Sequence, residues 1–212
     1  MSGPSASDEL VTTLLELGAA TLGESGGRAM RNRVRTAWTG AALAAPAFPV
    51  RCTPGDNLAI HVGVARAPSG TALVVEVGEE RELGYWGEVL TTAAEARGLA
   101  GLVIDGCVRD VTALAAHRFP VFSTGLALRG ATKNRPGGIG RTAVVGEVEV
   151  AVGDWVVGDA DGVVVVPGPT LAEVVAAGRL RAEKEVGYFT ALRGGATTLE
   201  LLSLDADLID GT

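Results

Sequence analysis

Residues 99–111 read LAGLVIDGCVRDV, and they combine an apolar strand, a turn and a charged pair. The first six residues are apolar over the length of one strand, which indicates a buried strand at 99–104. Asp105-Gly106 supplies the turn formers that end such a strand. The pair Arg109-Asp110 is not needed for that turn, so this end of the strand is a candidate functional site.

The sequence on both sides of this stretch alternates between strand and helix patterns. Helices are expected at 8–22, 58–64, 88–96, 111–116 and 169–193, and strands at 72–77, 99–104, 120–123, 143–145, 148–150, 155–157 and 163–166. The last four strands are separated by glycine-centred turns, which is typical of β-hairpins. The pattern predicts an α/β fold with mixed sheets, in one domain that spans residues 1–212.

Two segments have weaker patterns. The segment from Gly40 to Cys52 is rich in alanine and contains Pro46 and Pro49, so it suits an irregular or edge strand better than a central one. After Gly194-Gly195 the helical pattern ends, and the remaining residues are expected to form a tail.

Composition disfavours several classes of protein. The net charge is -7 and no run of Lys or Arg occurs, so a nucleic-acid partner is not expected. No stretch approaches ~18 uninterrupted apolar residues, and no basic segment with an apolar core opens the chain, so neither a membrane span nor a signal peptide is expected. Cys52 and Cys107 are too few for a disulfide framework, and a reducing cytoplasm is the simplest location.

Two other kinds of site have little support. Residues 138–143 match the dinucleotide pattern G-x-G-x-x-A, but they follow Pro136-Gly137 rather than a strand and precede a strand rather than a helix. His61 and His117 are far apart in the sequence and no third ligand is apparent, so a zinc site is not favoured.

Asp110 has two interpretations. As the N-cap of the helix expected at 111–116, it would stabilise that helix by ~1 kcal/mol, with Arg109 as a solvated neighbour. Alternatively, its carboxylate could hold Mg²⁺ or Mn²⁺, ions that prefer oxygen ligands and keep several waters. Arg109 would then neutralise an oxyanion next to the metal. Spacing alone leaves both interpretations open.

The helix start Gly87-Glu88-Val89-Leu90 favours the second interpretation. Free backbone N–H groups at a helix start, together with the helix dipole, form a binding site for a carboxylate such as that of a substrate. Glu88 could be a favourable acid of the first helical turn, or it could hydrogen-bond the waters of a bound metal.

Glu88 is separated by twenty residues from the pair Arg109-Asp110. This spacing resembles the D-x20-R-D signature of the class II pyruvate aldolases. This family is typified by 4-hydroxy-4-methyl-2-oxoglutarate aldolase, and its superfamily includes the regulator of ribonuclease activity A. The resemblance extends over most of the chain. It includes the segments 54–57, 97–110, 119–122 and 153–167.

The resemblance implies a swivelling β/β/α-type fold and a homo-oligomer, a trimer or a dimer of trimers, with active sites between subunits. Asp110 resembles the ligand of Mg²⁺ or Mn²⁺, and Arg109 resembles the residue that contacts the pyruvyl oxygen. Val89 and Leu90 match the positions whose amides receive the substrate carboxylate. Glu185 is a candidate for a glutamate that reaches the site from a neighbouring subunit, with a surface salt bridge as the alternative.

The implied activity is a divalent-metal-dependent lyase that cleaves 4-hydroxy-2-keto acids to pyruvate, with oxaloacetate decarboxylation as a second activity. The alternative is a non-enzymatic regulator that binds a ribonuclease or a similar protein. Two positions depart from the family pattern. Glu88 stands where the signature has aspartate, and Gly23-Glu24-Ser25 lies where family members commonly have a Ser-Asp pair. Both departures bear on the choice of substrate more than on the type of reaction.

Overall fold

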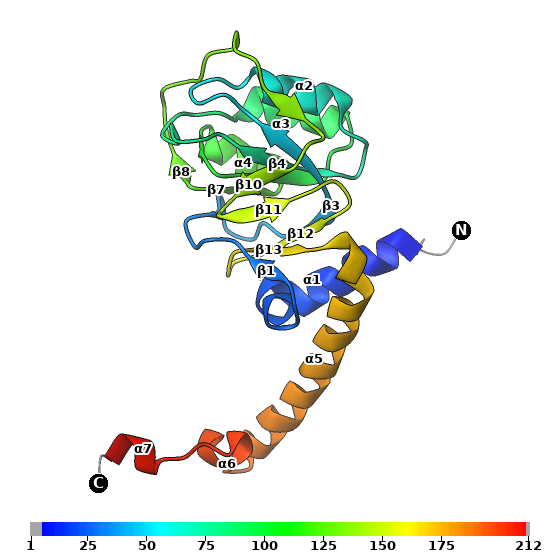
Figure 1. Cartoon of the computed structure of the whole chain (residues 1–212), viewed down its shortest axis with the longest axis vertical. Helices are drawn as coiled ribbons and strands as arrows, with labels where there is room; N and C mark the ends of the chain where they lie inside the picture. Colours follow the sequence, from blue (N-terminus) through cyan, green and yellow to red (C-terminus); the bar gives the residue numbers. More distant parts are fainter. Residues whose placement is uncertain (1–5, 211–212) are drawn as a thin grey trace.

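The computed structural model describes residues 6–210, and its helices lie outside a mixed β-sheet (Figure 1). The helices are α1 (Ala6–Glu24), α2 (Leu58–Arg66), α3 (Glu88–Ala96), α4 (Val111–His117), the 3₁₀ helix η1 (Gly168–Thr170), α5 (Leu171–Arg193), α6 (Thr198–Leu202) and α7 (Asp207–Asp210). The strands are β1 (Arg28–Ala29), β2 (Arg35–Thr36), β3 (Leu43–Arg51), β4 (Ala72–Glu76), β5 (Gly101–Ile104), β6 (Cys107–Val108), β7 (Val121–Ser123), β8 (Gly125–Leu126), β9 (Gly138–Ile139), β10 (Ala143–Val145), β11 (Val148–Val150), β12 (Trp155–Gly158) and β13 (Val163–Val166).

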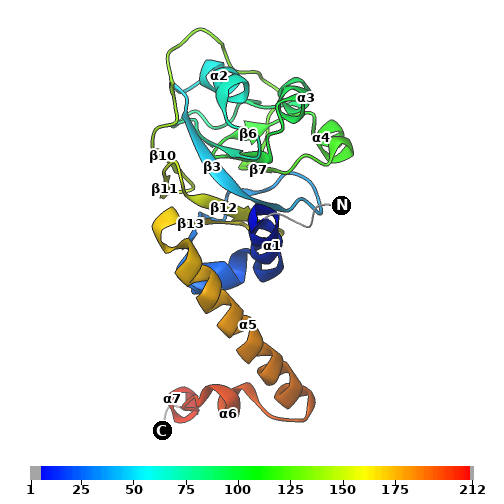
Figure 2. The ribbon, with the colours of Figure 1, turned by 90° about the vertical axis from the view of Figure 1, so that its right-hand side faces the viewer.

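The main sheet has nine strands in the order β1-β13-β12-β3-β4-β5-β7-β2, and β9 also pairs with β3. Strands β3, β4, β5 and β7 are parallel, whereas β1, β13, β12 and β3 pair antiparallel. Helices α2, α3 and α4 lie together beside the parallel part, and α1 and α5 lie at the antiparallel part (Figure 2). The predicted α/β fold with mixed sheets is therefore confirmed.

Strand β5 is buried along its whole length, as its apolar sequence predicts. Leu102 and Ile104 point into the core under α2, α3 and α4, where they join Tyr85, Trp86 and Leu114. Val103 points to the opposite face and joins the core formed with β10 to β13. Because both faces are covered, the end of β5 opens into a polar environment only beyond Ile104.

The expectation of an irregular or edge strand between Gly40 and Cys52 is wrong, because β3 is central in the sheet. It tolerates its prolines because it changes partners along its length. Pro46 lies opposite the first residue of β12, and β4 begins only opposite Ala47. Pro49 lies beyond the end of β12, and its carbonyl accepts a hydrogen bond from the Gly140 amide. Proline has no N–H group, but neither Pro46 nor Pro49 lies where a neighbouring strand would need a hydrogen bond from one.

The expectation of a tail after Gly194-Gly195 is also wrong within the described residues. Helix α6 begins there with a capping box: the Thr197 hydroxyl accepts from the Glu200 amide, and the Glu200 carboxylate accepts from the Thr197 amide. The pattern T-x-x-E that specifies this box was present in the sequence.

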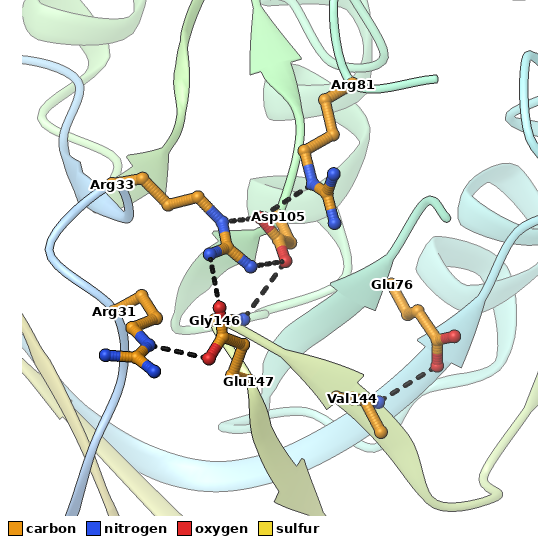
Figure 3. Close-up of polar contacts among 8 residues, drawn as sticks. All are labelled: Arg31, Arg33, Glu76, Arg81, Asp105, Val144, Gly146 and Glu147. Atoms are coloured by element: carbon orange, nitrogen blue, oxygen red, sulfur yellow. Dashed lines mark hydrogen bonds and ion pairs between the residues drawn. The ribbon is translucent and has the colours of Figure 1, made fainter. Parts of the chain in front are cut away.

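Asp105, expected only to form a turn, is a buried carboxylate that joins three segments (Figure 3). It accepts hydrogen bonds from Nε and Nη2 of Arg33 at 2.9 and 2.8 Å and from the Gly146 amide at 3.2 Å, and Nε of Arg81 lies 3.3 Å away. Burial alone would raise the pKa of Asp105, but its hydrogen bonds and charge pairing, chiefly with Arg33, outweigh burial and hold the pKa below its usual value. The end of β5 is thereby fixed to the turn between β10 and β11.

Substitution of Asp105 by asparagine is expected to lower the free energy of unfolding by about 2–4 kcal/mol at pH 7, because two guanidinium groups lose a buried anionic partner. The pKa of Asp105 is lower in the folded state, so its stabilisation is present above about pH 4 and is lost as the pH falls. Urea unfolding at pH 7 and at pH 3 measures both effects. The control, Glu149→Gln on the exposed side of β11, should change little. Equal stability of the Asp105 variant and the wild type at pH 7 would contradict this role.

Candidate functional site

Two turns meet at the charged pair. The first precedes α3 and includes Trp86 and Gly87, and the second follows β6 and includes Arg109 and Asp110. The Arg109 amide donates to the Trp86 carbonyl at 2.9 Å, and the Glu88 amide donates to Oδ2 of Asp110 at 3.1 Å. The structure thus places the Asp110 carboxylate at the N-terminus of α3, where the dipole stabilises its negative charge.

Three glycines allow this approach. A Cβ atom at Gly87 would lie 2.4 Å from Oδ2 of Asp110, and one at Gly84 would lie 3.0 Å from Cδ of Arg109. A Cβ atom at Gly130 would lie 3.3 Å from Nη1 of Arg109. The first distance is impossible for a real side chain, so Gly87 is required for this arrangement. Sequence analysis assigned no role to Gly84 or Gly130, because only the folded chain brings them to Arg109.

The interpretation of Asp110 as a side-chain cap of α4 is wrong. Its carbonyl accepts the first helical hydrogen bond, from the Leu114 amide, but its carboxylate makes no cap hydrogen bond to α4. The backbone of Asp110 is left-handed, with φ 60°, a conformation that aspartate tolerates better than most residues. This conformation allows the carboxylate to reach α3, where Nε of Arg109 lies 3.8 Å from Oδ2.

Glu88 contributes to the arrangement in two ways. Its amide donates to Asp110, while its carboxylate extends to the end of α4, where Oε1 lies 3.7 Å from Nε2 of His117. Nδ1 of His117 in turn lies 2.8 Å from Oε2 of Glu95. The His117 ring is therefore between two glutamates of α3, and the Glu88 side chain remains 57% exposed.

The amides of Val89 and Leu90 have no hydrogen-bond partner within residues 6–210. The next amide, that of Thr91, donates to the Gly87 carbonyl, so the helical ladder begins only there. Two free N–H groups at a helix start suit a carboxylate ligand. The Val89 side chain is exposed, whereas the Leu90 side chain is buried.

A cavity of about 220 Å³ lies next to these groups. Its walls include Asn57, His61, Tyr85, Val89, Leu90, Arg109, Asp110 and Lys133. A second hollow, of about 410 Å³, also includes Arg109 and Asp110 in its wall, and its other lining residues are the apolar Val108, Val111, Leu126, Ala127 and Leu128. The charged pair therefore borders both the polar cavity and a more apolar one. The sequence-predicted residues Glu88, Val89, Leu90, Arg109 and Asp110 are brought together at this place.

Asp56 fixes the loop that covers the polar cavity, a role that sequence analysis missed. Its carboxylate accepts from the Leu58 and Asn134 amides at 2.8 and 2.7 Å, from Oγ1 of Thr132 at 2.7 Å and from the Arg135 amide at 3.1 Å. Burial alone would raise the pKa of Asp56, but these bonds outweigh it and hold the pKa at about 2. The loop that carries Lys133 is thereby tied to the start of α2.

The donor set at the charged pair fits one kind of metal ion. The described residues contain no cluster of three or more His, Cys, Asp and Glu side chains, which a zinc site requires. Asp110 offers a half-exposed carboxylate next to a cavity with room for water and ligand oxygens. A single carboxylate completed by waters suits Mg²⁺ or Mn²⁺.

Glu185 does not lie at the site of its own chain. It is on α5, which projects away from the sheet (Figures 1 and 2), and its Oε1 lies 3.0 Å from Nε of Arg181 on the same helix. Within its own chain, Glu185 therefore forms the surface salt bridge that was the alternative interpretation. A contribution of Glu185 to the site of a neighbouring subunit remains a prediction.

The RraA-like family model, described as Aldolase/RraA, matches residues 6–165. A protein of Halalkalibacterium halodurans named "Putative 4-hydroxy-4-methyl-2-oxoglutarate aldolase" is 35% identical over 122 residues, which cover 58% of this chain and 58% of that protein. A Burkholderia mallei protein of the same name is 34% identical over 110 residues, covering 52% of this chain and 67% of that protein. The match thus spans less than two thirds of the first relative.

Two solved structures are similar over nearly the whole chain. An uncharacterized protein from Pseudomonas syringae has a TM-score of 0.82 and 27% identity, covering 96% of both chains. Streptomyces coelicolor RraAS2, titled an unusual member of the RNase ES inhibitor RraA protein family, has a TM-score of 0.73 and 25% identity, covering 90% of this chain and 98% of that one. Among the described residues, no helix has the length and apolar character to cross a membrane.

Substitution of Gly87 by alanine is expected to displace the Asp110 carboxylate from the Glu88 amide, because the new Cβ atom would overlap Oδ2. The overlap should lower the free energy of unfolding by about 1–3 kcal/mol. Chemical denaturation and a crystal structure of the variant measure the two effects.

Gly23→Ala in α1 is the matched control, since a Cβ atom there meets nothing within 4 Å. That variant should be neutral or up to about 1 kcal/mol more stable. If Gly87→Ala were equally stable and left the Asp110 carboxylate in place, the proposed role of Gly87 would be wrong.

Proposed function

Since this chain belongs to the RraA-like family, we propose that it is a divalent-metal-dependent carbon–carbon lyase that cleaves a 4-hydroxy-2-keto acid to pyruvate. One observation carries the proposal: the Arg109-Asp110 pair lies beside the free amides of Val89 and Leu90 at the wall of one cavity. The two free N–H groups suit the carboxylate of a 2-keto acid, and the guanidinium suits its 2-keto oxygen. The Asp110 carboxylate suits a cation bound next to them.

The proposed substrate binds through its carboxylate to the amides of Val89 and Leu90. Its 2-keto oxygen faces Arg109, and Asp110 would hold Mg²⁺ or Mn²⁺. A bound divalent ion would supply Lewis acidity at that oxygen. The hydrogen bond from the Glu88 amide fixes the orientation of the Asp110 carboxylate before substrate arrives.

Cleavage requires that the C4 hydroxyl group lose its proton, which a water molecule beside Asp110 would accept, so that C4 becomes the carbonyl of the second product. The electron pair of the broken C3–C4 bond stays on the other fragment as the pyruvate enolate, with negative charge at the 2-keto oxygen. A proton from water then returns to C3 and gives pyruvate.

Arg109 stabilises the negative charge of the enolate with its guanidinium, because its aliphatic chain lies against Gly84 and its Nη1 lies near Gly130 at the cavity wall. The Glu88 carboxylate, longer by one methylene than the aspartate of the family signature, lies beside His117 at the end of α4. It would have to turn toward Asp110 to orient water there. Oxaloacetate forms the same enolate when it loses CO₂, so decarboxylation of oxaloacetate is the proposed second activity.

The alternative function is that of a non-enzymatic regulator that binds a ribonuclease or a similar protein. It is supported by the similarity to RraAS2, which is described as an unusual member of the RNase ES inhibitor RraA protein family. Such a function does not need the free amides of Val89 and Leu90 beside a charged pair. We therefore favour the lyase.

We also propose that the chain works as a homo-oligomer, a trimer or a dimer of trimers, through the arm formed by α5, α6 and α7. The arm projects from the body (Figures 1 and 2). Helices α6 and α7 have only five and four residues, and isolated helices shorter than about 12–15 residues are marginal in water. Exposed apolar side chains along the arm are Leu180, Val186, Phe189, Leu199, Leu202, Leu204, Leu208 and Ile209.

Charge complementarity favours a second copy of this chain as the partner of the arm. Residues 194–212 contain four acidic residues and no Lys or Arg, whereas residues 111–146 contain five Lys or Arg and no Asp or Glu. The basic segment includes the loop that carries Lys133 over the polar cavity. An arm of one copy that docks there would bring Glu185 nearer to the site of another.

Asp110→Asn is expected to lower pyruvate release from 4-hydroxy-4-methyl-2-oxoglutarate to near background, and excess EDTA should do the same to the wild type. Arg109→Met should lower the rate about 10²- to 10³-fold, because one fixed positive charge at the developing oxyanion is lost. A coupled assay of pyruvate with added Mg²⁺ measures both. Asp161→Asn, in an exposed turn, is the control. Activity that survives both EDTA and Asp110→Asn would exclude the metal-dependent lyase.

Phe189→Asp is expected to reduce the size of the assembly, because a charge replaces an exposed apolar contact of the arm. Sedimentation velocity of both proteins measures the change. Ala177→Asp, at an exposed position nearer the body on the same helix, should leave the assembly unchanged. A monomeric wild type, or an unaltered Phe189 variant, would contradict the role of the arm.

A further inference from the structure

Two buried polar atoms in the wall of the polar cavity have no hydrogen-bond partner among the described residues. They are Oδ1 of Asn57 and Nε2 of His61. Asn57 is the N-cap of α2, and His61 follows four residues later, so both side chains lie on the same face of the helix. An unsatisfied buried polar atom costs about 1–3 kcal/mol, and such atoms in native proteins usually bind water or a ligand.

The orientation of the Asn57 amide is fixed by its neighbours. Asn57 is 4% exposed, and its Nδ2 donates to the Tyr85 carbonyl at 2.8 Å. A flipped amide would place two acceptor oxygens against each other, so Oδ1 must be the atom without a partner. This atom can only accept, and a ligand must therefore supply a donor to it.

His61 offers the complementary group. Burial lowers the pKa of His61, the nearby charge of Lys133 lowers it further, and Asp56 opposes the change only in part. The imidazole is therefore neutral at pH 7, and its two nitrogens divide the roles of donor and acceptor. With the proton on Nε2, His61 can donate to a ligand in the same cavity in which Oδ1 of Asn57 can accept.

We propose that Asn57 and His61 bind the hydroxyl group on the fourth carbon of the substrate and so determine specificity for 4-hydroxy-2-keto acids. A hydroxyl group can donate to Oδ1 of Asn57 and accept from Nε2 of His61, so it satisfies both atoms at once. This inference rests on the proposed lyase function, because Arg109 and Asp110 bind the keto-acid end in the same cavity. Lys133, at the cavity wall, adds a positive charge suited to a second carboxylate on the substrate.

A 2-keto acid with hydrogen in place of the hydroxyl group would leave both buried atoms unsatisfied. The C4 carboxylate of oxaloacetate could accept from Nε2 of His61 but would leave Oδ1 of Asn57 without a donor. Sites that hydrogen-bond a substrate hydroxyl reject analogues without it far more strongly than apolar pockets reject a missing methylene. The pair therefore acts on the distal half of the substrate, whereas pyruvate, the product that keeps only the keto-acid half, does not reach it.

The experiment compares the wild type with His61→Phe and His61→Gln. The readouts are kcat/KM for cleavage of 4-hydroxy-4-methyl-2-oxoglutarate and the inhibition constant of pyruvate. His61→Phe should lower kcat/KM at least about 10-fold, because one hydrogen bond to the substrate is lost. The inhibition constant of pyruvate should stay within about twofold. His61→Gln, whose amide nitrogen can replace Nε2, should recover most of the loss.

Arg66→Ala, at the exposed end of the same helix, is the control and should change neither value. If His61→Phe changed cleavage and pyruvate inhibition equally, or changed neither, the assignment of the hydroxyl site would be wrong while the lyase proposal would stand. If the wild type neither cleaved the substrate nor bound pyruvate, the lyase proposal itself would fail, and the hydroxyl site with it.

Discussion

The hydrogen bond between the Glu88 amide and the Asp110 carboxylate holds together the two turns on which the candidate site depends. It requires Asp110 to adopt a left-handed backbone and Gly87 to lack a side chain. Once the bond is made, the guanidinium of Arg109, the free amides at the start of α3 and the cavity beside α2 are fixed relative to one another. Each of these groups alone is common on protein surfaces, and their fixed arrangement is what makes the place a site.

Three aspartates near the site have different roles. Asp105 and Asp56 are buried and satisfied by several donors, and both have a pKa below the usual value. They fix the end of β5 and the loop over the cavity. The Asp110 carboxylate is half-exposed and makes a single hydrogen bond within residues 6–210, so it keeps acceptor capacity for a ligand. A buried and saturated carboxylate stabilises a fold, whereas an exposed and undersaturated one remains available for binding.

Much of the fold was accessible from local patterns. The boundaries predicted for α3 agree with the structure, and the strands 143–145, 148–150 and 163–166 were placed correctly because alternation and glycine turns are local signals. The role of β3 was not accessible, because its two prolines are tolerated only through the places where neighbouring ladders begin and end. Val89, Leu90, Arg109 and Asp110 do come together at one cavity, whereas Glu185 lies on α5 away from it. The roles of these residues in binding remain proposals.

By itself, the sequence determined the α/β fold with mixed sheets, the RraA-like resemblance and the identity of the charged pair, because these depend on periodicity and on motifs of fixed spacing. Only the tertiary structure decided which helix the Asp110 carboxylate caps, where Glu88 points and which atoms of Asn57 and His61 lack a partner. These features depend on distances between segments that are far apart in the chain. Such distances are set by packing of the whole sheet, and no local pattern of residues encodes them.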